Sequence, residues 1–216
     1  METLKSILAV LACTLISGCE TTNTGRRSSL QQSPSPTFVH TFTKFSFPVS
    51  VGTFHRSNVQ KYDGKGKDIG VGYNSSTPIA ATVFVYPGAK DFALLPSPKL
   101  ENVSEALLDT QFQACKLDIL RHHPDAKLIG EGSCNIVQGS NQFTGKKSTY
   151  SLGYNFGFAS QESVSELCVF LIEPSVKFLL TERYFVKYRI TYPLSRRGQA
   201  ESEVASFMTD LVWPAK

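Results

Sequence analysis

Residues 177–192 read KFLLTERYFVKYRITY, and this stretch decides the class of the fold. Almost every even position is apolar, while the odd positions carry mostly polar or charged side chains, with Phe185 among them. An alternation with period two is typical of a β-strand that buries one face. We expect the even face to lie beneath helices and the odd face to reach solvent or a polar groove. The apolar members of the even face are Phe178, Leu180, Tyr184, Val186, Tyr188, Ile190 and Tyr192.

The odd face of this strand carries the basic residues Arg183, Lys187 and Arg189. Side chains at i and i+2 lie about 7 Å apart on one strand face, so these like charges repel one another. The row predicts a contact with an acidic partner or an anionic headgroup. The alternative is that a carboxylate on the neighbouring strand, such as Glu166, neutralises it.

Further β-prone stretches lie on both sides of a helical region. The segment Asp63–Asp68 is a turn between two of them, because it lacks the residue spacing of an EF-hand or a P-loop. The other expected strands cover residues 38–47, 51–62, 69–73, 79–86, 126–137, 148–158 and 164–172.

Two helices are predicted. The first begins at Ser97 and Pro98, which suit the N-cap and the first helical position, and it ends by His123 because Pro124 follows. The second covers residues 199–212, where apolar side chains recur at helical spacing. This order of elements predicts an α+β fold: a mainly antiparallel sheet with two amphipathic helices packed on it.

The same order, with the segment Lys187–Pro193 followed by a terminal helix that runs to Trp213, resembles the PsbP-like fold. That family includes envelope lipoproteins of the DcrB kind. The resemblance implies a sheet between helices and a non-catalytic, accessory role.

The composition limits the class of protein. The chain has 216 residues, of which 41% are hydrophobic and 19% are charged, with a net charge of +4. This is a globular composition, which excludes a mostly disordered chain and a multi-pass membrane protein. The charge is too small and too scattered to indicate a nucleic-acid partner.

The N-terminus has the features of an export signal. Lys5 precedes the apolar run Ile7–Ile16, and small residues follow, which predicts a secretory signal peptide over residues 1–18. The segment Leu15-Ile16-Ser17-Gly18-Cys19 resembles the lipobox of bacterial lipoproteins. The resemblance implies cleavage before Cys19 and fatty acyl chains such as palmitate on that residue, which anchor the protein in a membrane. The alternative is an ordinary signal peptide with a chance cysteine.

The residues after Cys19 predict where and how the protein is held. Residues 19–37 are rich in polar residues and proline, without apolar periodicity, so we expect a flexible tether before a single domain over residues 38–216. Glu20, rather than aspartate, follows the cysteine. This favours the outer membrane facing the periplasm, with the inner membrane and the cell surface left open.

Three cysteines belong to the predicted domain. Cys115 lies on the first helix and Cys134 on the next strand, so we predict a disulfide between them in an oxidising envelope. Cys168 lies in an apolar run and is expected to be a small buried hydrophobe. The chain has no C-x-x-C sequence, so the cysteines give no support for a zinc site. His122 and His123 point in different directions on a helix, and we predict neither a metal nor another cofactor.

The strand tyrosines leave a second interpretation open. They are Tyr73, Tyr86, Tyr150, Tyr154, Tyr184, Tyr188 and Tyr192. Such residues line a glycan or peptide groove in some proteins, but more often they are core residues or cross-strand pairs.

The sequence therefore predicts a lipid-anchored envelope lipoprotein that acts as a non-catalytic binding or accessory module for a protein or other envelope component. The alternatives are an envelope hydrolase or transferase with dispersed catalytic residues, and a small-molecule or glycan receptor that uses the sheet tyrosines.

Overall fold

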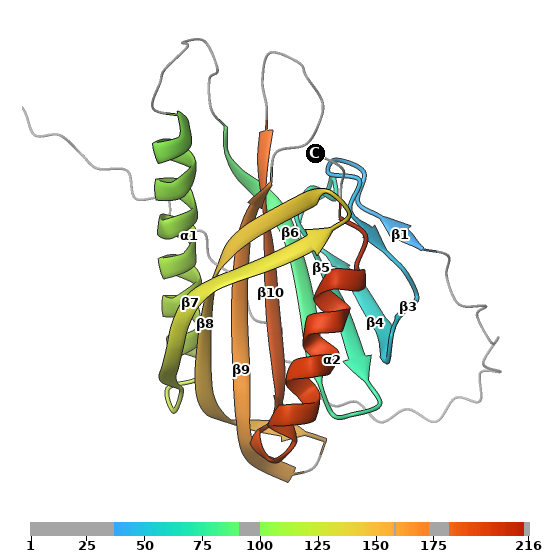
Figure 1. Cartoon of the computed structure of the whole chain (residues 1–216), viewed down its shortest axis with the longest axis vertical. Helices are drawn as coiled ribbons and strands as arrows, with labels where there is room; N and C mark the ends of the chain where they lie inside the picture. Colours follow the sequence, from blue (N-terminus) through green and yellow to red (C-terminus); the bar gives the residue numbers. More distant parts are fainter. Residues whose placement is uncertain (1–36, 91–99, 158, 173–181, 214–216) are drawn as a thin grey trace, which may run out of the picture. The chain divides into compact units, whose positions relative to one another are not determined.

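The computed structural model describes residues 37–90, 100–157, 159–172 and 182–213. They form an α+β fold with a mainly antiparallel sheet and two α-helices (Figure 1). The large sheet has eight strands in the order β3-β4-β5-β6-β10-β9-β8-β7, and a small separate sheet pairs β1 with β2. The bounds are β1 Phe38–Val39, β2 Ser46–Phe47, β3 Ser50–Val51, β4 Phe54–Lys61, β5 Ile69–Ser75, β6 Ala80–Lys90, α1 Leu100–His122, β7 Lys127–Gln138, β8 Asn141–Phe156, β9 Ala159–Ile172, β10 Glu182–Pro193 and α2 Arg197–Asp210, with a short 3-10 helix at Leu194–Arg196.

The strand that decided the fold class is an interior strand. β10 pairs with β6 on one side and with β9 on the other, and Tyr188 lies opposite both Val83 and Cys168. The predicted burial of its even face is confirmed from Tyr184 to Tyr192. Residues 177–181, which include Phe178 and Leu180, lie outside the described residues.

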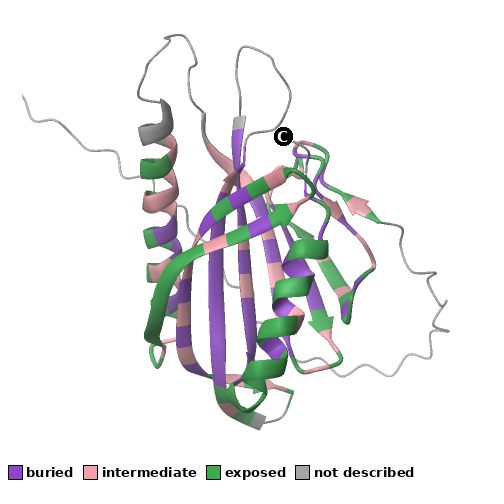
Figure 2. Cartoon of the chain, in the orientation of Figure 1, coloured by how far each residue is buried: buried purple, intermediate pink, exposed green. Residues whose placement is uncertain are grey.

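The buried residues, whose backbone is purple in Figure 2, form two clusters of packed side chains. The larger joins Phe207 of α2 to Tyr188 and to Trp213 near the end of the chain. The smaller joins Phe112 of α1 to Phe185 of β10. Tyr188 and Phe185 are at even and odd positions of the same strand, so the clusters lie on opposite faces of the sheet.

Several predicted boundaries are wrong. The expected strand over residues 38–47 is instead a small hairpin of β1 and β2, with a turn between them. β6 does not stop at Pro87 but continues to Lys90, because the register with β10 shifts between Glu182 and Tyr184 and an irregular position tolerates proline. β8 begins at Asn141, seven residues earlier than predicted.

The early start of β8 follows from a tight hairpin. Gly139 has φ of +60°, a conformation that glycine adopts at no steric cost, and it connects Gln138 of β7 to its partner Asn141. Residues 141–147 are mostly polar, so the sequence shows no apolar signal for the first part of β8. The predicted turn at Asp63–Asp68 is confirmed, and the Asp63 carboxylate accepts the Lys67 N–H at 2.8 Å.

Candidate functional site

The predicted disulfide between Cys115 and Cys134 is wrong. Both residues are free thiols. Cys115 is buried in the cluster beneath α1, while Cys134 packs against the cluster on the opposite face of the sheet. Cys134 packs against the same cluster as Cys168, which is one of its buried members. Cys19, the predicted lipidation site, lies outside the described residues.

The prediction that the odd face of β10 is exposed is wrong for Arg183, which is buried. Arg183 is only 4% exposed, and Phe185 on the same face is buried in the cluster that contains Phe112 of α1. Lys187 is half-buried, with Nζ 4.2 Å from the centre of the Phe84 ring. Arg189 is half-buried as well, and burial lowers the pKa of its guanidinium from the ordinary value. These residues form no exposed basic row, so the contact with an acidic partner loses its support.

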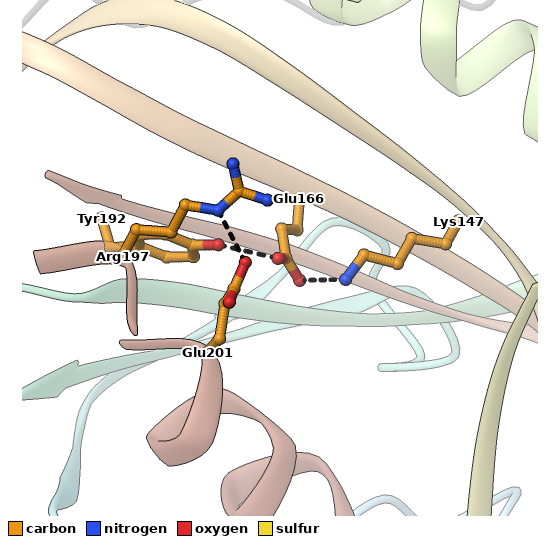
Figure 3. Close-up of polar contacts among 5 residues, drawn as sticks. All are labelled: Lys147, Glu166, Tyr192, Arg197 and Glu201. Carbon is orange, nitrogen blue, oxygen red and sulfur yellow. Dashed lines mark hydrogen bonds and ion pairs between the residues drawn. The ribbon is translucent and has the colours of Figure 1, made fainter. Parts of the chain in front are cut away.

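The suggestion that Glu166 neutralises this row is wrong too. Glu166 of β9 lies opposite Thr149 of β8 and Ile190 of β10, on the even face of β10. Lys147 and Tyr192 lie two residues from those partners and share the face. The Lys147 Nζ is 2.8 Å from one Glu166 carboxylate oxygen, and the Tyr192 hydroxyl donates to the other at 2.8 Å (Figure 3).

Burial and charge determine the protonation of this cluster. The Glu166 side chain is 5% exposed. Burial opposes the charge of Lys147, but the hydrogen bond and the charge of Glu166 outweigh it and raise the pKa of Lys147 above its ordinary value. Burial, with the Glu166 carboxylate, also raises the pKa of Tyr192. The ammonium and the phenol therefore remain protonated donors at neutral pH.

This Glu166 cluster links three strands. Each Glu166 carboxylate oxygen has one of the two partners, Lys147 on Oε2 and Tyr192 on Oε1. Beside it, Arg197 Nε donates to Glu201 Oε1 at 2.8 Å along the exposed side of α2 (Figure 3). Charged and hydrogen-bonded groups of this kind are expensive to leave unpaired, so the cluster fixes the relative positions of β8, β9 and β10.

A second carboxylate, that of Glu203, joins α2 to the part of the sheet formed by β3, β4 and β5. Glu203 of α2 accepts hydrogen bonds from the hydroxyls of Thr53, Ser75 and Thr77, at 2.7, 2.9 and 2.7 Å. Gln199 donates to it at 2.9 Å. Although desolvation raises the pKa of Glu203, these hydrogen bonds outweigh it and lower the pKa below its ordinary value. The cluster positions the β3–β4 and β5–β6 connections.

The strand tyrosines are mainly core residues. Tyr73, Tyr150, Tyr184, Tyr188 and Tyr192 are buried, and Tyr86 and Tyr154 are half-buried. Tyr73 and Tyr188, for example, pack edge-to-face on Phe207. This arrangement gives no support to a receptor that uses the sheet tyrosines.

A polar hollow of about 320 Å³ lies where α1 is followed by β7, beside β8 and β9. Asp125 borders it and accepts the Gly153 N–H at 2.7 Å, which lowers the pKa of the Asp125 carboxyl. No histidine or cysteine is among its lining residues, so the described part of the chain offers no thiol or imidazole there. The lining residues are Asp125, Lys127, Ser151, Leu152, Gly153, Ser160, Gln161 and Glu162.

Exposed apolar side chains lie at the β7 edge of the sheet. β7 is the last strand in the sheet order, and among the described strands it pairs with β8 alone. Residues 127–133 are all exposed, with Leu128 at 48% and Ile129 at 50%. Leu117 and Leu120 of α1, which ends five residues before β7 begins, are exposed as well. We call β7 residues 127–133 the β7 edge surface.

Neither a protein-family model nor a curated protein matches this sequence. Within the described ranges, no group of three or more His, Cys, Asp or Glu side chains is arranged to hold a metal ion. None of the helices in that part of the chain has the length and hydropathy needed to cross a membrane.

The sequence analysis missed the Glu166 cluster, the Glu203 cluster and the β7 edge surface. Glu166 stands in the apolar segment Val164–Ile172, and a carboxylate in a buried strand is a signal that it has a partner. No such signal exists for Glu203, because its hydroxyl donors lie more than 120 residues away in the chain.

Proposed function

We propose that this protein is a lipid-anchored accessory protein of the bacterial envelope, and that its domain binds another envelope protein without catalysis. The anchor rests on the lipobox-like segment Leu15–Cys19 that follows the apolar run Ile7–Ile16. Two or three acyl chains on Cys19 give a lasting attachment, whereas one chain gives only marginal binding. The tether over residues 19–37 gives the domain reach from the membrane, and Glu20 favours the outer membrane.

The observation that carries the binding role is the β7 edge surface. An edge strand presents unpaired N–H and C=O groups, which form hydrogen bonds with an extended segment of another protein. About half of the surface of Leu128 and Ile129 is exposed, both are apolar, and Ile129 is β-branched, which favours strands. We therefore infer that the partner supplies an extended apolar segment that pairs with β7.

The proposal includes the finer arrangement of the fold, in which α1 and α2 are amphipathic helices that cover the two faces of the sheet. The two clusters described above support it, since each contains buried side chains of one helix. With both faces covered, the edges are the parts of the sheet that remain for a partner.

An envelope hydrolase or transferase is the rival interpretation. It requires a nucleophile and a base that face one pocket. The polar hollow holds two carboxylates, one ammonium and serine side chains, with Asp125 already bound to a backbone N–H. This chemistry suits a hydrated surface better than an acyl-transfer site.

Two measurements test the proposal. Mass spectrometry of the mature N-terminus should find an acylated Cys19, and the Cys19→Ser variant should lack the modification. An unmodified N-terminus that begins elsewhere would refute the anchor.

Pull-down from crosslinked cells should recover a partner with the natural chain and lose it with Ile129→Lys. Equal recovery by Ile129→Lys would refute the binding surface.

A further inference from the structure

We propose that the surface formed by the β1–β2 turn and the β4–β5 connection docks on a membrane of anionic phospholipids, beside the point where the anchor joins the domain. The orientation rests on the anchor of the proposed function, whereas the attraction to anionic headgroups is a property of the domain itself. The partner of β7 takes no part in it. We call this region the lysine surface, and its members are Phe42, Lys44, Lys61, Tyr62, Lys65 and Lys67.

A buried histidine joins the two parts of the lysine surface. His40 is fully buried, and its Nδ1 accepts the Thr43 N–H at 3.3 Å, so its Nε2 carries the proton. Nε2 donates to the Gly66 carbonyl at 3.1 Å, although 26 residues separate the two in the chain. The Lys44 N–H donates to the His40 carbonyl at 2.8 Å. The β1–β2 turn and the β4–β5 connection are therefore fixed against each other.

Ammonium groups gather where these two turns meet. Lys44, Lys61 and Lys65 are exposed. Lys61 extends along its own connection, with Nζ 3.9 Å from the position that a Cβ atom of Gly66 would take. The negative surface potential of an anionic membrane attracts each lysine that lies close to it. Several lysines on one joined surface therefore match a charged sheet of headgroups.

The carboxylates of the β4–β5 connection compensate only part of this charge. Asp63 and Asp68 are both half-buried. One Asp63 carboxylate oxygen accepts the backbone N–H groups of Lys67 and Asp68, at 2.8 and 3.4 Å. This oxygen is thus directed into the turn, while the ammonium groups of the exposed lysines extend into solvent. The four lysines exceed the two aspartates, so the surface is positive.

The backbone at Lys44 gives a second, independent indication. Its φ is +63°, in the left-handed region that favours glycine. Non-glycine residues held in this region cluster at functional positions. A role of the Lys44 ammonium in binding explains why a lysine stands where the backbone favours glycine.

Aromatic side chains accompany the lysines. Tyr62 is 55% exposed, and its ring stacks on Phe84 with centroids 6.3 Å apart. Phe42 is half-buried, and the Lys67 Nζ lies 5.1 Å from the centre of its ring. Tyrosine is enriched at the level of the headgroups, where its apolar ring and polar hydroxyl both find suitable surroundings. Exposed lysines with an exposed tyrosine therefore favour a lipid surface over a soluble anion.

The position of the anchor favours the same contact. The described part of the chain begins at Thr37, directly before β1. Residues 19–36 connect it to Cys19 and span at most about 65 Å when fully extended. The proposed anchor thus joins the domain at the hairpin that carries Lys44, and it keeps the lysine surface near the headgroups. A weak charge contact is sufficient at such a high effective concentration.

The test uses the full chain in phospholipid vesicles, with its single tryptophan as the donor of energy transfer. Trp213 packs on Phe45 beside the β1–β2 turn, with ring centroids 5.3 Å apart, so transfer to a dansyl-labelled lipid reports how close the lysine surface lies to the membrane. We expect about twofold more transfer in vesicles that contain phosphatidylglycerol than in phosphatidylcholine alone. The gain should disappear at about 1 M salt, where the Debye length is only about 3 Å.

Charge-reversed variants assign the gain to the lysine surface. Lys44→Glu combined with Lys65→Glu should remove the gain, with the fold checked by circular dichroism. Arg121→Glu combined with Arg196→Glu is the matched control, because it makes the same change of charge at two exposed residues outside the lysine surface, and it should keep the gain.

Two readouts separate this contact from the anchor. Flotation with phosphatidylcholine vesicles measures the anchor alone, and a chain that does not float would refute the anchor while the gain with phosphatidylglycerol still tests the lysine surface. The inference is overturned if the natural chain shows no gain with phosphatidylglycerol, if salt leaves the gain unchanged, or if the two double variants behave alike.

Discussion

The two edges of the eight-stranded sheet are built differently. At one edge, β3 has only two residues, and β4 behind it exposes His55, Ser57, Asn58, Gln60 and Lys61. At the other edge, β7 has twelve residues and exposes Leu128 and Ile129 in a continuous run of exposed positions.

This difference shows which edge is suited to a partner. A very short outer strand, polar side chains and an irregular register discourage pairing with another chain. The edge formed by β3 and β4 has all three features. Its outer strand β3 is short, β4 exposes polar side chains, and the register of β4 with β5 shifts between Arg56 and Asn58. β7 also has a shift, between Leu128 and Gly130, but it combines length with exposed branched side chains. The predictions below address how each edge is held in place.

The largest effect is expected at Gly145 of β8, the strand that pairs with β7, because β8 packs closely against β9 there. Gly145→Val should lower the free energy of unfolding by about 3 kcal/mol, because its side chain meets the Val169 backbone and the Phe170 ring. Chemical denaturation measures the loss. Gly132→Val on β7 is the matched control: nothing lies within 4 Å of its Cβ position, and we expect a change within about 0.5 kcal/mol. Equal losses for both variants would contradict the close packing of β8 against β9 at Gly145.

The next effect is expected at Gln138, which fastens the end of β7 to the C-terminal end of α2. Its amide donates to the carbonyls of Thr209 and Leu211, and its carbonyl accepts the Trp213 N–H at 3.1 Å. Gln138→Ala should lower the free energy of unfolding by about 2 kcal/mol, because partly buried backbone groups lose their partners.

The control for this variant lies on the other edge. Gln60 of β4 is exposed and donates only to the neighbouring Lys61 carbonyl. Gln60→Ala should therefore change the free energy of unfolding by less than about 0.5 kcal/mol. A Gln138→Ala variant as stable as Gln60→Ala would contradict this account of how β7 is held.

The smallest of these effects concerns Glu203, which holds the β3–β4 edge to α2 through Thr53. Since the folded-state pKa of Glu203 is lowered, its contribution to stability is present above the unfolded pKa of about 4.3 and is lost as pH falls through the folded pKa. Glu203→Gln should lower the free energy of unfolding by about 1 kcal/mol at pH 7, and this difference should shrink below pH 4. Denaturation at pH 7 and pH 3 measures this difference.

Glu201→Gln, which affects only an exposed pair with Arg197, is the control. A Glu203→Gln deficit that is the same at both pH values would contradict the assigned pKa shift.

The sequence predicted the elements with local signals and missed those that depend on distant partners. The period-two pattern of Tyr184–Tyr192 correctly predicted a strand with a buried even face. The same pattern gave the wrong environment for Arg183, because local alternation does not reveal the second buried cluster, which contains Phe185 on the same face. The Cys115–Cys134 prediction failed for a related reason: closeness in the chain says nothing about which face of a sheet each side chain occupies.

The β7 edge surface was missed because edge position is a property of the whole sheet order. Nothing in residues 127–133 distinguishes an outer strand from an inner one. The position of β7 at the edge follows only when the pairing of the other seven strands is known. Conversely, the lipobox-like segment at Cys19 is visible only in the sequence, since it lies outside the described residues.

Site-specific photo-crosslinking in cells tests the central claim most directly. A photoreactive residue replaces Ile129 on β7 in one full-length chain and Asn58 on β4 in another, both exposed strand positions. After illumination, we expect a discrete adduct of higher mass from position 129 and none from position 58. An adduct from position 58 alone, equal adducts from both positions, or no adduct from position 129 would contradict the claim that β7 is the binding edge.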